Sequence, residues 1–501
     1  MNAVVTPIGN RPLTLPKGLG FLFGAVAAFT LAYTFTPLSF LTVVYLWCLL
    51  ALARLGSGRR AFYFGLAVGL LCYSFQLSCF YTIFGWAAVA LWFVLAFWIG
   101  LFVALARLCW LNLKPIWAAL LIPFLWTGLE YFRSELYYLR FSWLNVGYAF
   151  SHSPLLPAFP WLGMYGVGFL AMGAAVLASQ PFLRPRSQNG KPRESGWAAK
   201  NTEDREPLVA ETRWKQAAIL GLILAPAATM VLAFRSSEAD QKPGTVSAKS
   251  VRVAGVQLEF PTDAQVIAAL DELLTAEPEA ELLVLSEYTF DGPVPERVQA
   301  WCREHRRYLI VGGKDPAPKA NFYDTAFVIG PSGEIAFRQV KSVPIQFFAD
   351  GLPAPDQKLW DSPWGKIGLC ICYDLSYTRV TDRLIRLGAQ ALIVPTMDVV
   401  DWGRREHELH ACVAPIRAAE YGIPIFRLAS SGVSQCVDRS GRVRAWAKFP
   451  GQEEMIGARL ALAGPGTLPL DRWLAPFATG VTVLFIVWRL ARHRFWSAPS
   501  V

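Results

Sequence analysis

Charged residues are scarce in this chain of 501 residues. Asp, Glu, Lys and Arg make up 17% of the chain, whereas soluble domains carry about 25%. Apolar and aromatic side chains are correspondingly abundant, at 54% and 14% for the two overlapping groups. A composition this poor in charge excludes a protein that is soluble throughout. Part of the chain is therefore expected to face lipid.

The cysteines lack the spacing of a disulfide framework or a structural zinc site. Cys370 and Cys372 form a C-x-C pair without the second pair that zinc would need. His407 and His410 are three residues apart, not the four of zinc proteases. Four other cysteines lie in apolar stretches, where cysteine is usually a small buried hydrophobe: Cys48, Cys72, Cys79 and Cys109. No metal or other cofactor is expected.

The net charge of +10 is not arranged as a nucleic-acid surface. The basic residues cluster beside apolar runs, in short loops and near the C-terminus. A nucleic-acid interface would need a basic stripe interleaved with stacking aromatics, and the sequence has none. Nucleic acid is therefore not an expected partner.

Eight apolar runs predict membrane spans, because about 20 apolar residues cross the hydrocarbon of a bilayer. The runs fall at residues 18–35, 37–54, 61–80, 85–109, 115–132, 155–180, 215–234 and 471–488. The first lacks the cleavage site of a removable signal peptide, which predicts a retained anchor. We expect a transmembrane helical domain over 1–235, with seven spans, and a C-terminal transmembrane helix at 471–488. Arg472 and Arg489 bound this last run and are expected to reach the two membrane interfaces.

Short basic loops predict the orientation, because Lys and Arg favour the cytoplasmic side of a membrane. With the N-terminus in the cytoplasm, every strongly basic short segment falls on that side. These segments are Arg54 to Arg60, Arg107 to Lys114, the polar linker 184–213, and the C-terminal tail with Arg489, Arg492 and Arg494. Both termini are then cytoplasmic, and residues 250–465 lie on the opposite side.

Residues 250–465 have the pattern of an α/β domain. Runs rich in β-forming residues occur at 251–256, 282–285, 308–311, 367–371, 391–394 and 423–427. Helical patterns alternate with them at 264–276, 296–306, 376–388 and 404–421. Strands separated by helices predict crossover connections and a layered sheet.

Three polar residues at predicted strand ends suggest nucleophilic catalysis. Cys372 lies at a strand-to-helix turn, where free backbone N–H groups favour a thiolate and can stabilise an oxyanion. Glu287 ends a very apolar strand, and a desolvated glutamate can act as a general base. Lys341 ends a third strand and can supply a positive charge. Singly, each has a plain structural explanation. If the strands belong to one sheet, the three side chains converge on one edge.

The order Glu287, Lys341, Cys372 resembles the nitrilase superfamily, whose Glu-Lys-Cys triad lies on an αββα sandwich. The surrounding motifs agree: Asn321-Phe-Tyr-Asp-Thr325, Cys372-Tyr-Asp374, Thr396-Met-Asp398 and Arg417-Ala-Ala-Glu420. The spans on both sides resemble bacterial apolipoprotein N-acyltransferases, which are membrane-embedded members of that superfamily. Trp126-Thr-Gly-Leu-Glu130-Tyr-Phe-Arg133 and Phe141-Ser-Trp143-Leu-Asn-Val-Gly147-Tyr148 are similar to that family's W-x-x-L-E-x-x-R and F-P-W-x-x-x-G-Y segments.

The resemblance implies a ping-pong acyl transfer without a cofactor. Glu287 would take the thiol proton, and Cys372 would attack an ester of a membrane phospholipid, with phosphatidylethanolamine the expected donor. Lys341 and the backbone N–H of Tyr373 would stabilise the oxyanion. The acyl group would then pass from the thioester to the α-amino group of the diacylglyceryl-cysteine of an apolipoprotein. Such an enzyme is expected as a monomer in the bacterial inner membrane, with its catalytic domain on the periplasmic side.

The chain departs from that family's pattern around the triad. Leu285-Ser-Glu287 replaces W-P-E, and Asp374 replaces the glutamate of C-Y-E. Asp350 is the candidate for a second acid, in place of another glutamate. The resemblance also suggests a structural hydrogen bond for His410. These changes bear on substrate identity more than on fold.

Several residues are candidates for substrate binding. Four follow Lys341 in a loop and are expected either as a lid dipping into lipid or as core packing: Phe347, Phe348, Leu352 and Trp360. The others are Trp402, Trp143 and Glu130. Glu130 has an alternative explanation as half of an interfacial ion pair with Arg133.

Two other functions fit parts of the pattern. A membrane-anchored amidase of the nitrilase type would hydrolyse a small amide in a compact polar pocket, without phospholipid. A scaffold with a decayed site would bind lipid or lipoprotein without catalysis, and the intact triad argues against it. Formation of an acyl group on Cys372 separates the transferase from both.

Overall fold

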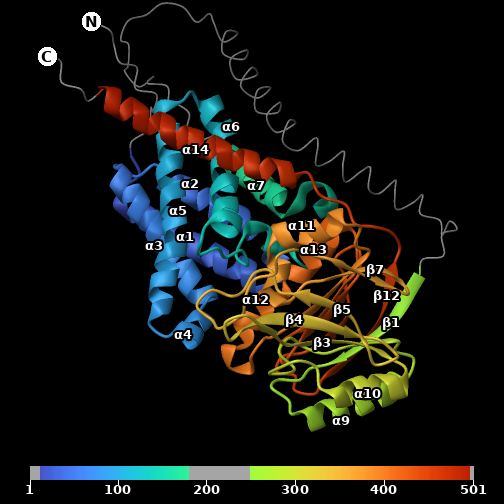
Figure 1. Ribbon diagram of the computed structural model, residues 1–501. Helices are drawn as coiled ribbons and strands as arrows, with labels where there is room; N and C mark the ends of the chain where they lie inside the picture. Colours follow the sequence, from blue (N-terminus) through green and yellow to red (C-terminus); the bar gives the residue numbers. More distant parts are fainter. Residues whose placement is uncertain (1–11, 180–248, 497–501) are drawn as a thin grey trace, which may run out of the picture.

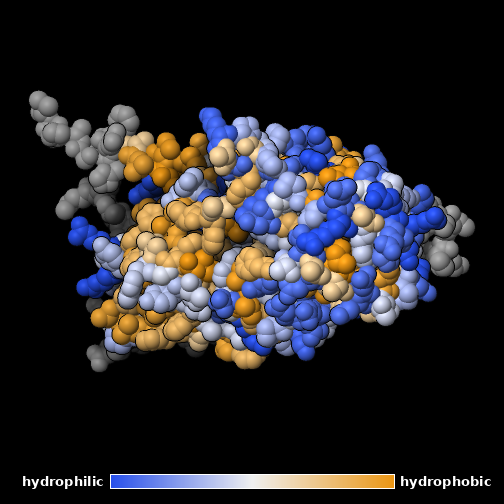
Figure 2. Space-filling view, turned by 60° about the horizontal axis from the view of Figure 1, so that its bottom comes forward, coloured by the Kyte–Doolittle hydropathy of each residue, from blue (hydrophilic) through white to orange (hydrophobic). Residues whose placement is uncertain are grey.

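The computed structural model describes residues 12–179 and 249–496, with side chains described as far as Arg492. The predicted span at 215–234 and the linker 184–213 lie outside these residues. A helical part and an α/β domain pack against each other, with the C-terminal helix lying along the helical part (Figure 1). Apolar side chains cover much of the helical part, and hydrophilic ones cover the α/β domain (Figure 2). This division agrees with a domain in lipid and a domain in water.

The helical part is built from apolar helices. Their bounds are α1 (Leu15–Thr34), α2 (Leu41–Leu52), α3 (Gly58–Gln76), α4 (Cys79–Phe84), α5 (Ala87–Asn112), α6 (Pro115–Tyr131), α7 (Phe159–Ser179) and α14 (Asp471–Trp496). The long helix α14 packs against α6 and α7, although hundreds of residues separate it from them in the chain. The helix predicted after the catalytic domain therefore completes the helical part.

Five helical segments among the described residues are long and apolar enough to cross a membrane. They are Leu15–Thr34, Ala87–Asn112, Pro115–Leu136, Leu156–Ser179 and Asp471–Arg492. Helix α2 is apolar but has only 12 residues, and α3 is not among the five. The count of eight spans accordingly stays a prediction.

The α/β domain contains two six-stranded sheets. The first has the order β12-β1-β2-β3-β4-β5: Met455–Leu462, Lys249–Val256, Leu282–Val284, Tyr308–Ala317, Asn321–Ile329 and Ile335–Val340. The second has the order β11-β10-β9-β8-β7-β6: Val443–Ala447, Ser434–Val437, Ile425–Ala429, Ala391–Thr396, Gly365–Leu369 and Leu359–Ser362. Val253 and Leu282 of the first sheet share a buried core with Ile367 and Ile393 of the second.

Helices cover the outer face of each sheet. The first sheet packs against α9 (Asp263–Ala276) and α10 (Glu296–His305). On the second sheet lie α11 (Thr378–Arg386), α12 (Arg404–Ala411) and α13 (Val413–Tyr421). The predicted αββα sandwich, joined to a helical membrane part, is therefore confirmed. One continuous apolar core runs from the helical part through α13 to the second sheet.

Polar contacts at the start of α14 tie the two parts together. Asp471 is 1% exposed, and its carboxylate accepts a hydrogen bond from the backbone N–H of Tyr165 at 2.9 Å. The next residue, Arg472, pairs with Asp382 of α11 at 2.9 Å and with Glu420 of α13 at 3.2 Å. Arg472 lies at the end of a candidate span, as predicted for a residue at a membrane interface. Its guanidinium is bound to the α/β domain, because two buried carboxylates lie there.

We expect Gly163→Ala to weaken this junction. Gly163 has a φ of +67°, and a Cβ there would lie 2.1 Å from the carboxyl carbon of Asp471. Backbone strain of this kind costs about 1–3 kcal/mol, and the clash adds to it. The thermal midpoint in detergent should fall. Gly480→Ala in α14 is the matched control, since no atom lies within 4 Å of its Cβ position; an equal fall in both would contradict the explanation.

Candidate active site

Cys372 lies in a strained turn between a strand and a helix. It follows β7 and begins a short 3-10 turn, Cys372–Ser376, with a φ of +50°. This left-handed conformation is uncommon for a residue other than glycine and is often found at functional sites. The side chain is 2% exposed, and the thiol donates to the carbonyl oxygen of Met397 at 3.8 Å. The turn thus holds the sulfur at the strand end, as predicted.

Glu287, Lys341 and Cys372 come from two facing sheets, so the prediction of one shared sheet is wrong. Glu287 follows β2 and Lys341 follows β5, both in the first sheet, whereas Cys372 follows β7 in the second. The sandwich brings the corresponding ends of both sheets together. The three side chains therefore meet in its interior, and each is at most 2% exposed.

The ammonium group of Lys341 is surrounded by buried carboxylates. Its Nζ lies 2.6 Å from Glu287 Oε1, 2.8 Å from Asp350 Oδ2 and 3.4 Å from Asp324 Oδ2. Burial alone lowers the pKa of Lys341, but Glu287, Asp350 and the other acidic groups outweigh burial and hold it well above its usual value. Lys341 is therefore charged at neutral pH. Burial and the charge of Glu287 raise the pKa of Asp324.

The thiol of Cys372 is expected to rest in its neutral form. Burial raises its pKa well above the usual value, the charge of Glu287 raises it further, and Lys341 opposes both. The backbone N–H groups of the turn were expected to favour a thiolate, but burial has the larger effect. A neutral thiol needs a base as it attacks. Glu287 Oε1 contacts Lys341, and its other oxygen, Oε2, accepts a hydrogen bond from the backbone N–H of Met397 at 2.7 Å. These two contacts orient the carboxylate.

Asp350 and Asp374 hold the loop that follows Lys341. Besides pairing with Lys341, Asp350 accepts from the Tyr288 hydroxyl at 2.7 Å and from the backbone N–H of Ile345 at 2.6 Å. Asp374 accepts from the backbone N–H of Val343 at 2.7 Å, so the cysteine turn is joined to the lysine loop. The structure therefore places Asp350 beside the triad and Asp374 behind it.

Asp374 should give a measurable pH dependence of stability. Burial raises its pKa to about 6, although hydrogen bonds from the Ser342 and Val343 backbone and the charge of Lys341 oppose this. An unfolded aspartate has a pKa of about 3.9. Because the folded pKa is the higher one, the stability that this group contributes below about pH 4 is lost as the pH rises through about 6.

We expect wild type to lose roughly 3 kcal/mol more than Asp374→Asn between pH 4 and pH 7, from a shift of about two pH units. Thermal midpoints of both proteins across this range provide the measurement. The difference in slope is the readout, since the substitution also changes stability at every pH. Parallel profiles would contradict the assignment.

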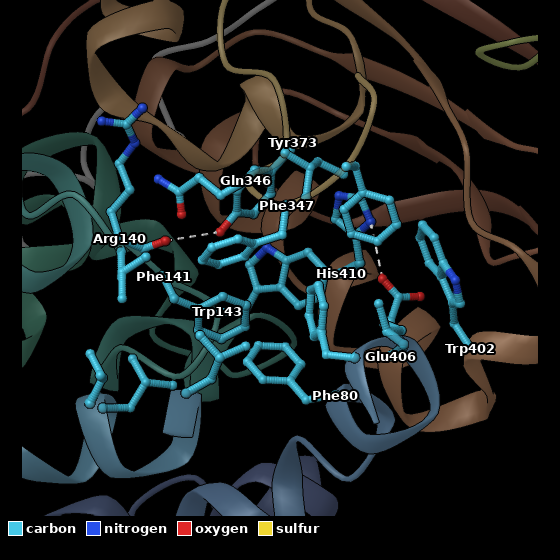
Figure 3. Close-up of a pocket in the computed structure, with 18 of the residues that line it drawn as sticks. Phe80, Arg140, Phe141, Trp143, Gln346, Phe347, Tyr373, Trp402, Glu406 and His410 are labelled. Carbon is cyan, nitrogen blue, oxygen red and sulfur yellow. Dashed lines mark hydrogen bonds and ion pairs between the residues drawn. The ribbon is translucent and has the colours of Figure 1, made fainter. Parts of the chain in front are cut away.

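An apolar pocket of about 840 Å³ leads to Cys372. The helical part supplies Phe80, Leu91, Leu95, Phe141 and Trp143, and the catalytic domain supplies Phe347, Phe348, Tyr373 and Trp402. Figure 3 shows aromatic side chains from both parts pointing into it. Neither part alone encloses it.

The structure sorts the predicted substrate-binding residues. Phe347, Phe348, Trp402 and Trp143 line the pocket, and the first two are 67% and 40% exposed. Trp360 is 4% exposed and lies in the core between the sheets. Of its two expected roles, core packing is therefore correct and the lid is wrong.

Two further candidates lie away from the pocket. Leu352 is half-buried, its backbone N–H donates to Phe322, and it does not line the pocket. Glu130 lines a separate small cavity in the helical part and accepts from the backbone N–H of Val146. Its suggested partner Arg133 instead binds Tyr73 and Asn145.

Several residues of the site were not predicted. Asp324 contacts Lys341, and the Met397 backbone contacts Glu287. His410 Nδ1 lies 2.8 Å from Asp398 Oδ1, which agrees with the structural hydrogen bond expected for this histidine. Its ring stacks on Trp143 at 4.5 Å between centroids. Asp398 lies two residues after the end of β8, so the strand-end criterion that found Glu287 also applies to it.

Within the described parts of the chain, three buried clusters have the spacing of metal ligands. They are Cys372 with Asp398 and His410, Asp398 with Glu406 and His407, and Glu287 with Asp324 and Asp350. Positively charged side chains already pair with the acidic groups of these clusters. Arg427 pairs with Asp398, and Lys341 lies among the carboxylates of the third cluster. The arrangement can therefore function as an acid–base centre with its own counter-charge.

Curated proteins similar over most of the chain are apolipoprotein N-acyltransferases. The one from Geobacter metallireducens is 23% identical, over 84% of this chain and 84% of its own length. That of Shewanella oneidensis is 24% identical, over 87% and 88%. A deaminated glutathione amidase from Dictyostelium discoideum is 26% identical, but over only 30% of this chain and 60% of its own.

Domain comparisons separate the two similarities. The apolipoprotein N-acyltransferase N-terminal domain matches residues 23–177, and the carbon-nitrogen hydrolase domain matches residues 260–464. The chain belongs to the apolipoprotein N-acyltransferase family. The amidase covers 30% of this chain, whereas the two apolipoprotein N-acyltransferases cover 84% and 87%. The first domain supplies one wall of the pocket, at Phe80, Leu95 and Trp143.

Proposed function

We propose that this member of the apolipoprotein N-acyltransferase family moves a fatty acyl chain from a membrane phospholipid to an apolipoprotein. The chain would pass through a thioester on Cys372 to the α-amino group of the N-terminal diacylglyceryl-cysteine. The observation that carries the proposal is the apolar pocket that ends at a buried cysteine. A long acyl chain fits its lining, because aromatic and aliphatic side chains form most of it.

The proposed first half-reaction acylates the enzyme. Glu287 accepts the thiol proton as the sulfur of Cys372 forms a bond to the ester carbonyl carbon. The Lys341 ammonium and the Tyr373 backbone N–H stabilise the oxyanion, and losing one such donor costs about 2.7–4 kcal/mol in other enzymes. When the carbon–oxygen bond breaks, Glu287 returns the proton to the leaving alkoxide. The products are a lysophospholipid and an acyl thioester.

In the second half-reaction, the acyl group leaves the enzyme, and Glu287 again accepts and returns a proton. The α-amino nitrogen of the acceptor attacks the thioester carbonyl, and Glu287 takes a proton from nitrogen. Collapse of the tetrahedral intermediate breaks the carbon–sulfur bond, and Glu287 returns the proton to the thiolate. The product carries an amide bond on its N-terminus. One carboxylate serves both directions, which fits its central place beside Lys341.

The proposal includes a location and a topology. The chain would be a monomer in the bacterial inner membrane, with a transmembrane domain at 1–235, a catalytic domain at 250–465 and a last helix at 471–488. The catalytic domain would lie on the periplasmic side and both termini in the cytoplasm. Both substrates are anchored in lipid, so an active site at the membrane surface can reach them.

Mass spectrometry of the intact protein tests the proposal. We expect incubation with phosphatidylethanolamine of defined chains to add one acyl group, which peptide mapping places on Cys372. Addition of a diacylated lipopeptide should remove that group and leave an N-acylated product. Hydrolysis of small amides without any acyl group from phospholipid would favour the amidase instead. Binding of lipid without either reaction would favour the scaffold.

A further inference from the structure

Two arginines lie near one buried tyrosine at the rim of the pocket. The guanidinium carbon of Arg140 is 5.2 Å from the centre of the Tyr377 ring, and that of Arg379 is 5.9 Å from the same centre. Arg140 also lines the pocket, and Figure 3 shows its side chain beside Gln346. Arg140 thus lines the pocket, and Arg379 lies beside the same tyrosine without lining the pocket.

Neither guanidinium has an ion pair within the part of the chain that the structure describes. The Nε of Arg140 is buried and lacks a hydrogen-bond partner there. Glu135 and Asp374 are the nearby carboxylates, and neither forms an ion pair with these arginines among the described residues. Glu135 accepts from the backbone N–H of Thr378, and Asp374 accepts from the lysine loop. Burial, followed by the charge of Arg140, lowers the pKa of Arg379, and the charges of both carboxylates raise it and so oppose part of the effect of burial.

An anion would stabilise this arrangement. Two like charges destabilise each other. Arg379 is exposed, but Arg140 is half-buried and its Nε lacks a partner among the described residues. Guanidinium groups suit phosphate, because their planar N–H groups can bind two of its oxygens at once. The pair therefore has the chemistry of a phosphate subsite whose ligand arrives from outside the protein.

The position of the pair connects it to the reaction. The carbonyl oxygen of Arg140 accepts from the Tyr373 hydroxyl at 3.3 Å and from the Tyr377 hydroxyl at 3.4 Å. Tyr373 directly follows Cys372 and lines the same pocket. An anion held by the arginines would therefore lie beside the route to the thiol.

We propose that Arg140 and Arg379 bind the phosphate of the phospholipid acyl donor. This rests on the proposed function and names the group that distinguishes its two lipid substrates. A phospholipid carries a phosphate near its ester bonds, whereas a diacylglyceryl-cysteine has none. The pair would thus select the donor in the first half-reaction and have no ligand in the second.

The test compares a phospholipid with diacylglycerol of the same chains. Rates of acyl-Cys372 formation are measured in the same micelles for wild type, Arg140→Gln, Arg379→Gln and the double variant. We expect each substitution to lower the ratio of the phospholipid rate to the diacylglycerol rate about tenfold, as for the loss of one charge-assisted hydrogen bond. The loss should be similar for phosphatidylethanolamine and phosphatidylglycerol, because both carry the phosphate.

Two further variants define the cause. Arg303→Gln removes the same charge from the exposed face of α10, far from the helical part, and should keep the wild-type ratio. Arg140→Lys keeps the charge without the planar fork and should restore part of the ratio. An unchanged ratio in the double variant would overturn the proposal.

Binding experiments keep the result independent of catalysis. In Cys372→Ala protein, an ether-linked phospholipid should bind more tightly than the matching diether glycerol, and the double arginine variant should lose this difference. If wild type forms no acyl-enzyme but this difference is present, the proposed function fails and the phosphate subsite stands. If inorganic phosphate protects wild type against unfolding, and the lipid preference does not depend on the arginines, the pair binds free phosphate and the proposal is wrong.

Discussion

Cys372→Ala is expected to reduce N-acylation of a diacylated lipopeptide by at least about a thousandfold, since removing an enzyme's nucleophile has effects of this size or larger. No thioester can form without the sulfur. The surrounding pocket and the Lys341 cluster should remain, because alanine fits the space of the thiol. Product formation by mass spectrometry and acyl-enzyme formation from phosphatidylethanolamine are the two measurements.

Cys370→Ala is the matched control for this experiment. Cys370 lies two residues earlier, is fully buried, and packs in the core between the second sheet and its helices. The same atom is removed, at a site with no connection to the pocket. We expect it to retain activity, with a modest loss of stability from the small cavity. A Cys372→Ala protein that still acylates would disprove the thioester mechanism.

Local sequence patterns were sufficient to find three polar residues that the structure brings into one buried site. Glu287, Lys341 and Cys372 each follow a run of strand-forming residues, and each lies at a strand end in the structure. The choice of sheet was wrong because it depends on long-range pairing. Strands β2 and β7 have similar apolar sequences, yet they belong to facing sheets.

Environment was harder to predict for single side chains. Trp360 stands in a stretch with proline and glycine, which suggested an exposed loop. In the structure it belongs to β6, which pairs with β7 and directs the ring between the sheets, against Tyr308 and Trp364. The role of Asp324 could not be predicted, because a single aspartate in a strand does not indicate a site. Its contact with Lys341 depends on how the strands pair.

The pocket explains why the two domains occur in one chain. Trp143 of the helical part donates its indole N–H to the Ser376 hydroxyl at 2.9 Å and stacks on His410. Its ring thus fixes the turn that begins at Cys372 to the membrane domain. This face of the catalytic domain meets apolar helices, so the route to the thiol is suited to a lipid.

Lys341→Met is expected to lower the free energy of unfolding by about 3–5 kcal/mol, the usual cost of removing one partner of a buried ion pair. Methionine has a similar length, so the loss is mainly electrostatic. Glu287, Asp324 and Asp350 would then share a buried site without a cation. The thermal midpoint should fall clearly in detergent, and acyl-enzyme formation should be lost with it.

A second substitution separates charge from packing. In Lys341→Met with Glu287→Gln, one of the uncompensated carboxylates is removed, so part of the lost stability should return while activity stays absent. The coupling energy from this double-mutant cycle measures the interaction between the two side chains. If the double variant is no more stable than Lys341→Met, the loss comes from packing, and the ammonium is not the counter-charge that holds the catalytic carboxylate in place.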